Sequence, residues 1–269
     1  MNFGKYEYFE SCDTSNFVTM DLLSRLFRTE RTLPVLLFGN WTQTFLSFRT
    51  LILSIGIFLS QTSLVIAKMS IEMYGGYQTS PHSVVMGNYR ASSISDELVP
   101  FRFTAGWKGK SFSMPPYYGI RFTNWKSISG LGLDFTHSKA YADRITRTNA
   151  GFELLQFTDG LNNLTIHRQI ELDIIQNRIL TYYGYGAGVI LPHVEFQADK
   201  TLTRTFEYQY GGPTIAFNSG FRVPIAEHKF FFAEYKFTAS WLDVNLNGGG
   251  SLETRILTNA LNVGLGFEF

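Results

Sequence analysis

The sequence predicts an all-β protein: an eight-stranded antiparallel transmembrane β-barrel preceded by an N-terminal signal segment. Apolar and polar residues alternate with a period of two in stretches of about ten residues, as in strands with one lipid face and one lumen face. After residue 67 no apolar run is long enough to cross a bilayer as a helix. The final stretch alternates most clearly and ends in Phe269.

The N-terminal region, 1–67, is expected to be a targeting segment. Residues 51–67 read LILSIGIFLSQTSLVIA, an interrupted apolar run that suits a secretory h-region better than a membrane-spanning helix. Small residues predict cleavage after Ala67, which leaves 68–269 as the barrel. Residues 1–48 receive no function and are interpreted as an upstream extension from a misjudged start codon. The alternative is an uncleaved N-terminal anchor.

Composition narrows the class of protein. Hydrophobic residues make up 45% of the chain and charged residues 17%, which excludes a disordered protein. A formal net charge of +1 argues against a nucleic-acid partner. Cys12 is the only cysteine, so disulfides and thiolate metal sites are excluded. This does not imply the cytosol, because a hydrogen-bonded barrel needs no disulfides.

The C-terminal strand defines the two faces. One face carries Leu261, Val263, Leu265, Phe267 and Phe269, and the other carries small and polar residues. We assign the apolar face to lipid. An alternating last strand with a terminal phenylalanine resembles the C-terminal signature of bacterial outer-membrane barrels, which the barrel-assembly machinery reads.

Other stretches alternate in the same way: 70–78, 130–139, 161–172, 179–190, 213–223 and 229–243. Arg168 interrupts one apolar face, which fits a position near a membrane interface. Residues 101–109 and 117–125 also resemble strands, which gives nine. Because bacterial barrels have an even number, we join 101–125 into one long second strand and count eight. Pro115 and Pro116 would interrupt that strand.

Connection lengths predict the orientation, since periplasmic turns are short and outer loops are long. The short links are 126–130, 176–178 and 226–228. The long connections are 79–100, 140–160, 192–209 and 244–255. Both ends of the barrel then face the periplasm.

Charged residues of the predicted lumen are expected mainly to pair with one another, because side chains fill a barrel of eight strands. They are Glu72, Arg121, Asp134, Glu171, Glu234 and Lys236. The outer end carries histidines and carboxylates on different strands, which together can bind a divalent metal or exchange protons. These are His82, His137, His193, Asp134, Asp159 and Glu195. For any single histidine, an ordinary surface position is the alternative.

Other chemistries fit less well. YGYGAG lies within a predicted strand and is therefore no phosphate loop, and the motifs HExxH and GxSxG do not occur. A Ser-His-Glu hydrolase stays open, because a triad is defined in space and not by sequence order. Its candidate nucleophiles are Ser83, Ser111 and Ser138.

Several longer stretches carry a resemblance. They are YGGYQTSPHS (74–83), GWKGKSFSMPPYYGIR (106–121), LDFTHSKAYAD (133–143), FTDGLNNLT (157–165), GAGVILPHVEF (186–196), RTFEYQYGG (204–212) and FAEYK (232–236). Together they resemble the lipid A oxidase family of outer-membrane barrels from rhizobia and their relatives. The similarity spans essentially all of 70–269, and such barrels are broadly similar to the opacity-protein and OmpA-like type.

The resemblance implies an oxygen-dependent enzyme of the cell outer membrane. Such an enzyme oxidises the proximal glucosamine of lipid A, within lipopolysaccharide, to 2-aminogluconate, with molecular oxygen as co-substrate and a divalent metal ion assisting. On position and chemistry, the candidate metal ligands are His82, His137 and His193. The candidate catalytic carboxylates are Asp134, Asp159 and Glu195. The candidate substrate-binding residues are Lys108, Lys110, Arg121 and Lys139.

The expected partners are lipid A, the outer membrane and, through Phe269, the assembly machinery, and the barrel is expected to be monomeric. Two other functions compete with the oxidase. One is a non-enzymatic opacity-type barrel that binds a surface or braces the membrane. The other is a lipid A deacylase that uses a serine at the outer end.

Overall fold

The computed structural model describes residues 68–92, 94, 96–175 and 178–269. The signal segment expected in 1–67, its cleavage after Ala67, and Cys12 lie outside the described residues. Among those described, no helix is long and apolar enough to span a bilayer.

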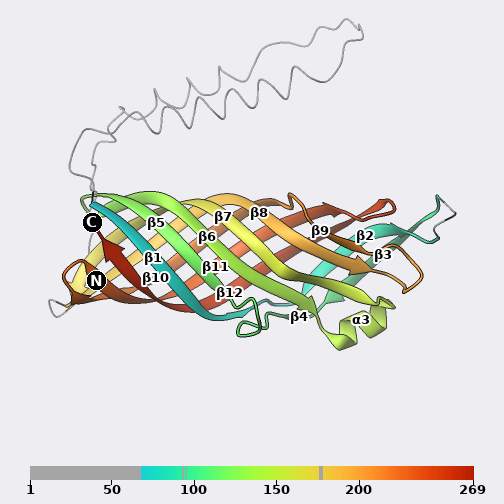
Figure 1. Ribbon diagram of the computed structural model, residues 1–269, viewed down its shortest axis with the longest axis horizontal. Coiled ribbons are helices and arrows are strands. Elements are labelled where there is room, and N and C mark those ends of the chain that lie inside the picture. Colours follow the sequence, from blue (N-terminus) through green and yellow to red (C-terminus); the bar gives the residue numbers. More distant parts are fainter. Residues whose placement is uncertain (1–67, 93, 95, 176–177) are drawn as a thin grey trace, which may run out of the picture. The chain divides into compact units, whose positions relative to one another are not determined.

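Eight strands form a closed antiparallel ring (Figure 1). They are β1 (Lys68–Thr79), β5 (Tyr118–Lys126), β6 (Ser129–Ala142), β7 (Leu154–Ile175), β8 (Ile179–Gln197), β10 (Gly212–Ala226), β11 (Lys229–Asn245) and β12 (Gly250–Glu268). The ring closes where β1 pairs with β12, from Ser70 opposite Glu268 to Thr79 opposite Asn259. The predicted all-β, eight-stranded barrel is therefore confirmed.

Shorter elements extend one end of the ring. They are β2 (Ser83–Arg90), β3 (Leu98–Ala105), β4 (Trp107–Lys108), β9 (Thr205–Tyr208) and the helix α3 (Arg144–Ala150). Strands β2 and β3 form a hairpin on the far end of β12, while β4 pairs with β6 and β9 pairs with β8. Asp143 caps α3 by accepting a hydrogen bond from the Thr146 amide.

The prediction of one long second strand over 101–125 is wrong. Residues 101–105 belong to β3, and the second strand of the ring, β5, begins only at Tyr118. The intervening chain contains Pro115 and Pro116, which have no amide hydrogen to donate to a ladder. The count of eight survives because β2 and β3 stand outside the ring.

The assignment of faces is confirmed. On β12, Leu261 is 66% exposed, and Val263 and Leu265 are also exposed. On β11, the predicted lumen residues Glu234 and Lys236 are buried. The outward apolar side chains therefore form a belt around the ring, as expected of a barrel that contacts lipid.

The two ends of the ring differ in the way that the connection lengths predicted. At one end β5 leads to β6, and β10 to β11, through two-residue turns in which Ser127 and His228 adopt positive φ. Arg168 lies close to this end, where its Nε donates to the hydroxyl of Ser129 at 2.9 Å. The longer connections and the hairpin of β2 and β3 lie at the other end. We call this the outer end.

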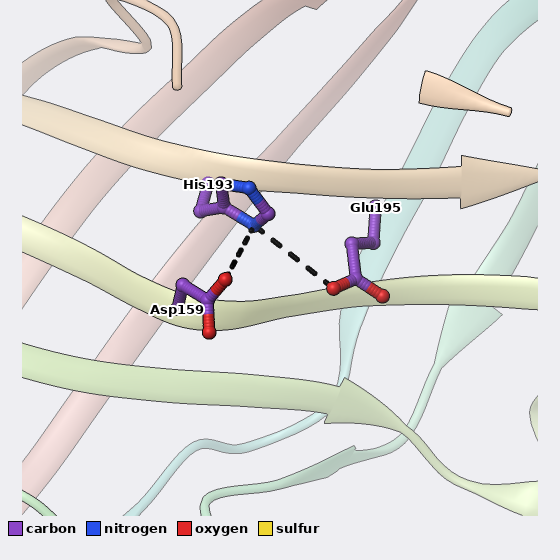
Figure 2. A group of neighbouring side chains, drawn as sticks. All are labelled: Asp159, His193 and Glu195. Carbon is purple, nitrogen blue, oxygen red and sulfur yellow. Dashed lines mark ion pairs between the residues drawn. The ribbon is translucent and has the colours of Figure 1, made fainter. Parts of the chain in front are cut away.

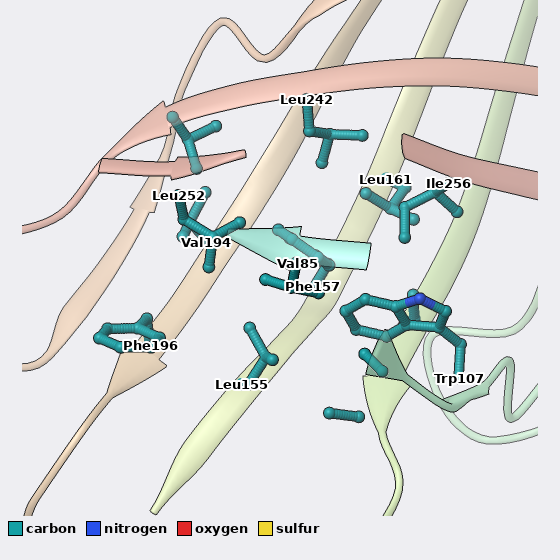
Figure 3. Packing of buried hydrophobic residues seen from close by; sticks show 14 of the residues in the cluster. Val85, Trp107, Leu155, Phe157, Leu161, Val194, Phe196, Leu242, Leu252 and Ile256 are labelled. Carbon is teal, nitrogen blue, oxygen red and sulfur yellow. The ribbon is translucent and has the colours of Figure 1, made fainter. Parts of the chain in front are cut away.

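The interior holds two layers of different chemistry. Within the membrane belt, the expected charged residues pair across the lumen, with Arg121 donating to Glu72, Asp134 and Glu234 at 2.7 to 3.0 Å. Toward the outer end an apolar core replaces them (Figure 3). It includes Trp107, Phe157, Leu161, Ile190 and Leu252. This core lets strands β6, β7 and β8 continue as a rigid wall beyond the lipid.

Candidate functional site

Three neighbouring strands change from apolar to polar outward residues toward the outer end. The apolar outward residues of β6, β7 and β8 end at Phe135, Leu164 and Leu191. Two residues nearer the outer end on each strand are His137, Asn162 and His193, which face the same way because side chains alternate along a strand. Outward polar residues therefore begin on these strands where the apolar belt ends, on the side of the outer end.

Asp159, His193 and Glu195 converge on this outer wall (Figure 2). The Nδ1 atom of His193 lies 3.6 Å from Asp159 Oδ2 and 4.0 Å from Glu195 Oε1. His193 and Glu195 are buried, whereas the side chain of Asp159 is 49% exposed. The cluster therefore has one open side, at the aspartate.

Strand β9 covers the cluster with two aromatic rings. Phe206 and Tyr208 lie edge-on to the imidazole of His193, with ring centroids 4.5 and 4.7 Å away. The hydroxyl of Tyr208 donates to the backbone carbonyl of Asp159 at 2.8 Å. These contacts bury His193 on the outside of the barrel, where lipid or water would otherwise reach it.

Hydrogen bonds keep Glu195 ionised. Its carboxylate accepts from Gln156 at 2.6 Å and from the hydroxyl of Thr158, and Arg204 lies 3.1 Å away. Burial alone would raise the pKa of Glu195, but these donors hold the pKa below its ordinary value. Glu195 is therefore an anion at neutral pH.

The trio is suited to a divalent cation. One nitrogen and two carboxylate oxygens lie within 4.8 Å of one another, and this is the donor set that first-row divalent metals accept. The Nδ1 atom of His193 is buried and has no hydrogen-bond partner. A buried nitrogen that has no hydrogen-bond partner and faces two carboxylates is free to coordinate a metal ion.

A cationic surface flanks the trio on β4 and β6. Lys108 lies opposite Tyr141 in the pairing of the two strands. The Nζ atoms of Lys110 and Lys139 lie 3.8 and 5.8 Å from the centre of the Tyr141 ring. Tyr141 in turn pairs with Gln156, which bonds Glu195. Three of the four predicted substrate-binding residues therefore border the trio.

The lysines influence one another. Burial lowers the pKa of Lys139, and the nearby charge of Lys110 lowers it further. Burial raises the pKa of Tyr141, and so do the carboxylates of Glu195 and Asp159. The cationic and anionic halves of this outer wall are thus close enough to act on the same small headgroup.

The structure does not gather the three predicted histidine ligands into one set. Of the described residues, only Asp159, His193 and Glu195 form a histidine and carboxylate group close enough to hold a metal. His137 stacks on Tyr118, with centroids 5.1 Å apart, and its Nδ1 contacts Asn162 at 2.8 Å. It borders the trio without joining it.

The remaining predicted residues lie elsewhere. His82 lines a separate cavity of about 820 Å³, together with Trp241 and Arg255. Asp134 and Arg121 lie in the lumen and bond each other at 3.0 Å. The candidate metal site therefore combines one predicted histidine with two predicted carboxylates.

The serine candidates for a hydrolase make hydrogen bonds to groups that are not imidazoles. Ser83 contacts Thr254 and accepts from the Trp107 indole. Ser111 accepts from the amide of Gln78. Ser138 donates to a backbone carbonyl, that of residue 161. Each hydroxyl is thus bonded to a group other than an imidazole.

Sequence reasoning missed the residues that position Glu195. Gln156 is the last paired residue before a register shift in the pairing of β7 with β8, and Thr158 lies within that shift, between Gln156 and Leu161. Arg204 stands just before the four-residue strand β9. A possible signal was the motif RTFEYQYGG, in which alternating aromatics follow an arginine.

Two comparisons by sequence find no match. No protein-family model matches the chain. The search of curated proteins finds no match either.

Solved structures of small barrels are similar in fold. Neisserial surface protein A matches with a TM-score of 0.43 and 10% identity over 75% of this chain and 97% of its own. The outer-membrane protein AlkL matches with a TM-score of 0.43 and 12% sequence identity. The match covers 78% of this chain and 94% of AlkL. Ail from Yersinia pestis matches with a TM-score of 0.32 and 10% sequence identity. The match covers 74% of this chain and 99% of Ail.

The architecture of the barrel indicates that the protein lies in the outer membrane. A closed antiparallel ring leaves no strand edge unpaired within the belt, and its outward belt is apolar. Short turns at one end and long connections at the other complete the architecture of an outer-membrane β-barrel.

Proposed function

We propose that this protein is an outer-membrane enzyme that oxidises the proximal glucosamine of lipid A to 2-aminogluconate with molecular oxygen. One observation carries the site: Asp159, His193 and Glu195 bring an imidazole nitrogen and two carboxylates together on neighbouring strands β7 and β8 (Figure 2). Lipid A occupies the outer leaflet, so its sugar headgroup lies at the level of this wall. The resemblance of the sequence motifs to lipid A oxidases supplies the reaction.

Each part of the wall has a role in this chemistry. Oxidising the anomeric carbon of the hemiacetal to a lactone removes two electrons and two protons from the sugar, and these reduce oxygen to hydrogen peroxide. Water then opens the lactone to give 2-aminogluconate, so the sugar gains one oxygen atom overall. Asp159, as the exposed carboxylate, is placed to take the hydroxyl proton. A divalent metal held by Asp159, His193 and Glu195 would supply redox or Lewis-acid chemistry.

The lysines bind the headgroup in this proposal. Lys108 and Lys110 present exposed cations beside the trio, the buried Lys139 adds its charge next to them, and anionic groups on a lipid headgroup match this charge. The aromatic rings of β9 keep water from His193. Binding therefore places the sugar between the lysines and the open side of Asp159.

The two competing functions have less support. A deacylase needs a serine next to a base, and the three candidate serines are bonded elsewhere. A non-enzymatic barrel leaves unexplained why the buried Nδ1 atom of His193, which has no hydrogen-bond partner, faces two carboxylates. We therefore favour the oxidase.

Mass spectrometry of lipid A from cells with and without the gene tests this function. The wild type is expected to add one oxygen atom to the glucosamine unit. Asp159→Asn should lower the modified fraction about 100-fold, the lower end of what a positioned proton-transfer group contributes. His193→Ala should lower it at least as much and should also reduce divalent metal bound by the purified protein.

His228→Ala is the matched control, because that exposed histidine lies in a short turn at the opposite end of the barrel. It should leave the product unchanged, and heat-modified gel mobility should show that every variant is folded. Loss of an acyl chain would instead identify a deacylase. Lipid A that is identical with and without the gene would contradict both enzymes.

A further inference from the structure

The loop between β4 and β5 exposes large apolar side chains. Phe112 is 78% exposed and Met114 is 85% exposed, and Pro115 beside them is also exposed. The loop projects beyond the ring next to β4 (Figure 1). We call residues 111–116 the apolar loop. Exposed apolar groups gathered in one short segment indicate a partner that is itself apolar.

The apolar loop is held in place by hydrogen bonds. The hydroxyl of Ser111 accepts from the amide of Gln78 on β1 at 2.9 Å. The amide of Tyr117 donates to the carbonyl of Ser111, and the amide of Ser113 donates to that of Lys110. These bonds fix the backbone at both sides of the exposed residues. Phe112 and Met114 are therefore presented outward by an ordered support.

The level of the apolar loop is that of the lipid belt. The ring of Phe112 stacks on that of Tyr77, with centroids 6.3 Å apart and an angle of 28° between the planes. Tyr77 is an outward residue of β1, and it pairs with Leu261 of β12. Leu261 is the most exposed of the apolar residues on the lipid face of that strand. Phe112 thus continues the lipid-facing surface.

Cations stand at the base of the apolar loop. Lys108 and Lys110 precede it, and the Nζ atom of Lys139 donates to the carbonyl of Ser113 at 2.7 Å. Exposed apolar side chains next to ammonium groups match the neighbouring acyl chains and anionic headgroups of a leaflet. Because cations accompany the apolar side chains, we expect the partner of the apolar loop to be lipid and not another protein.

We propose that the apolar loop is an interfacial anchor that inserts Phe112 and Met114 between acyl chains of the outer leaflet. The inserted side chains set the depth of the neighbouring lysines, because Lys139 is bonded to the same loop. This role stands whether or not the protein oxidises lipid A. It requires only that the barrel lies in a bilayer.

Spin labels on single cysteines test the depth of the loop in phosphatidylcholine vesicles. Cys12→Ser provides the background, and labels replace Phe112 and Met114 in turn. Met73→Cys serves as the lipid reference, because Met73 is an exposed outward residue of β1. Ile145→Cys serves as the water reference, because Ile145 is exposed on α3 at the outer end.

At positions 112 and 114 collisions with dissolved oxygen should exceed those with a water-soluble nickel chelate, as at position 73. The ratio should reverse at position 145. Heat-modified mobility should confirm that all four labelled proteins are folded, since every replaced side chain is exposed. Nickel accessibility at 112 and 114 equal to that at 145 would overturn the anchor.

Discussion

At the scale of single residues, Arg121 shows how ion pairs stabilise charged side chains that are buried in the lumen. Its guanidinium contacts Glu72, Asp134 and Glu234, which come from three different strands. It is fully buried, so its desolvation is offset by these three ion pairs and their hydrogen bonds. Lys236 adds a second cation beside Asp134 at 2.8 Å. The network ties β1, β5, β6 and β11 together across the lumen.

Arg121→Met should therefore destabilise the barrel strongly. It leaves three buried carboxylates close together with one cation fewer, and we expect a loss of about 3–5 kcal/mol in the free energy of unfolding. Urea unfolding in detergent micelles measures it by linear extrapolation. Lys200→Met, at an exposed pair with Glu153, should cost less than about 1 kcal/mol. Equal stability of the two variants would contradict the network.

The pairing within the lumen was predictable from residue type and alternation, and the site on the outer wall was predictable only in part. His193 and Glu195 share a face because they are two residues apart on one strand. Asp159 joins them through a register shift in β7, which no periodicity reveals. His82 was grouped with them because it also follows a strand at the outer end. A residue's height along the barrel axis, however, does not tell where around the circumference of the ring it lies.

At the scale of elements, the ring strands follow from their alternation, whereas the hairpin of β2 and β3 does not. Its residues were expected to be a long connection and part of a long strand. The hairpin is stabilised by its contribution to the apolar core of the outer end, where Val85 and Ala105 are fully buried. Such tertiary packing overrides what local pattern indicates.

This core should behave as a unit of its own. Phe157 is fully buried within it, so Phe157→Ala should cost about 3–5 kcal/mol through lost contacts and a residual cavity. Proteolysis of folded protein should then cut first in the hairpin of β2 and β3 and near α3, while the membrane belt stays intact. Ile145→Ala, at an exposed position on α3, should leave the cutting pattern unchanged. Unaltered protease resistance of the Phe157 variant would show that this core does not hold the outer end together.

At the scale of the whole molecule, the barrel is closed by the two ends of the described chain. The amide of Met69 donates to the carbonyl of Phe269, and the amide of Phe269 donates to the carbonyl of Met69, both at 2.9 Å. The seam then continues along β1 and β12 for ten residue pairs. Phe269 thus has a structural role in closing the barrel, which can be tested separately from the expected role of its ring as an assembly signal.

Removing Phe269 should affect assembly in cells more than stability in micelles. The deletion loses two backbone hydrogen bonds, each contributing about 0.5–1.5 kcal/mol, from a seam that keeps its other pairs. If the assembly machinery reads the terminal phenylalanine, the folded fraction in cells should fall several-fold while refolding of purified protein into micelles persists. Heat-modified gel mobility measures both.

Phe269→Ala separates the two roles, because it keeps the backbone bonds of the seam and removes only the ring. It should match the deletion in cells and the wild type in micelles. Full assembly of the alanine variant in cells would mean that the phenylalanine ring is not what the machinery reads. Failure of both variants to refold in micelles would instead place the whole effect on the closure of the barrel.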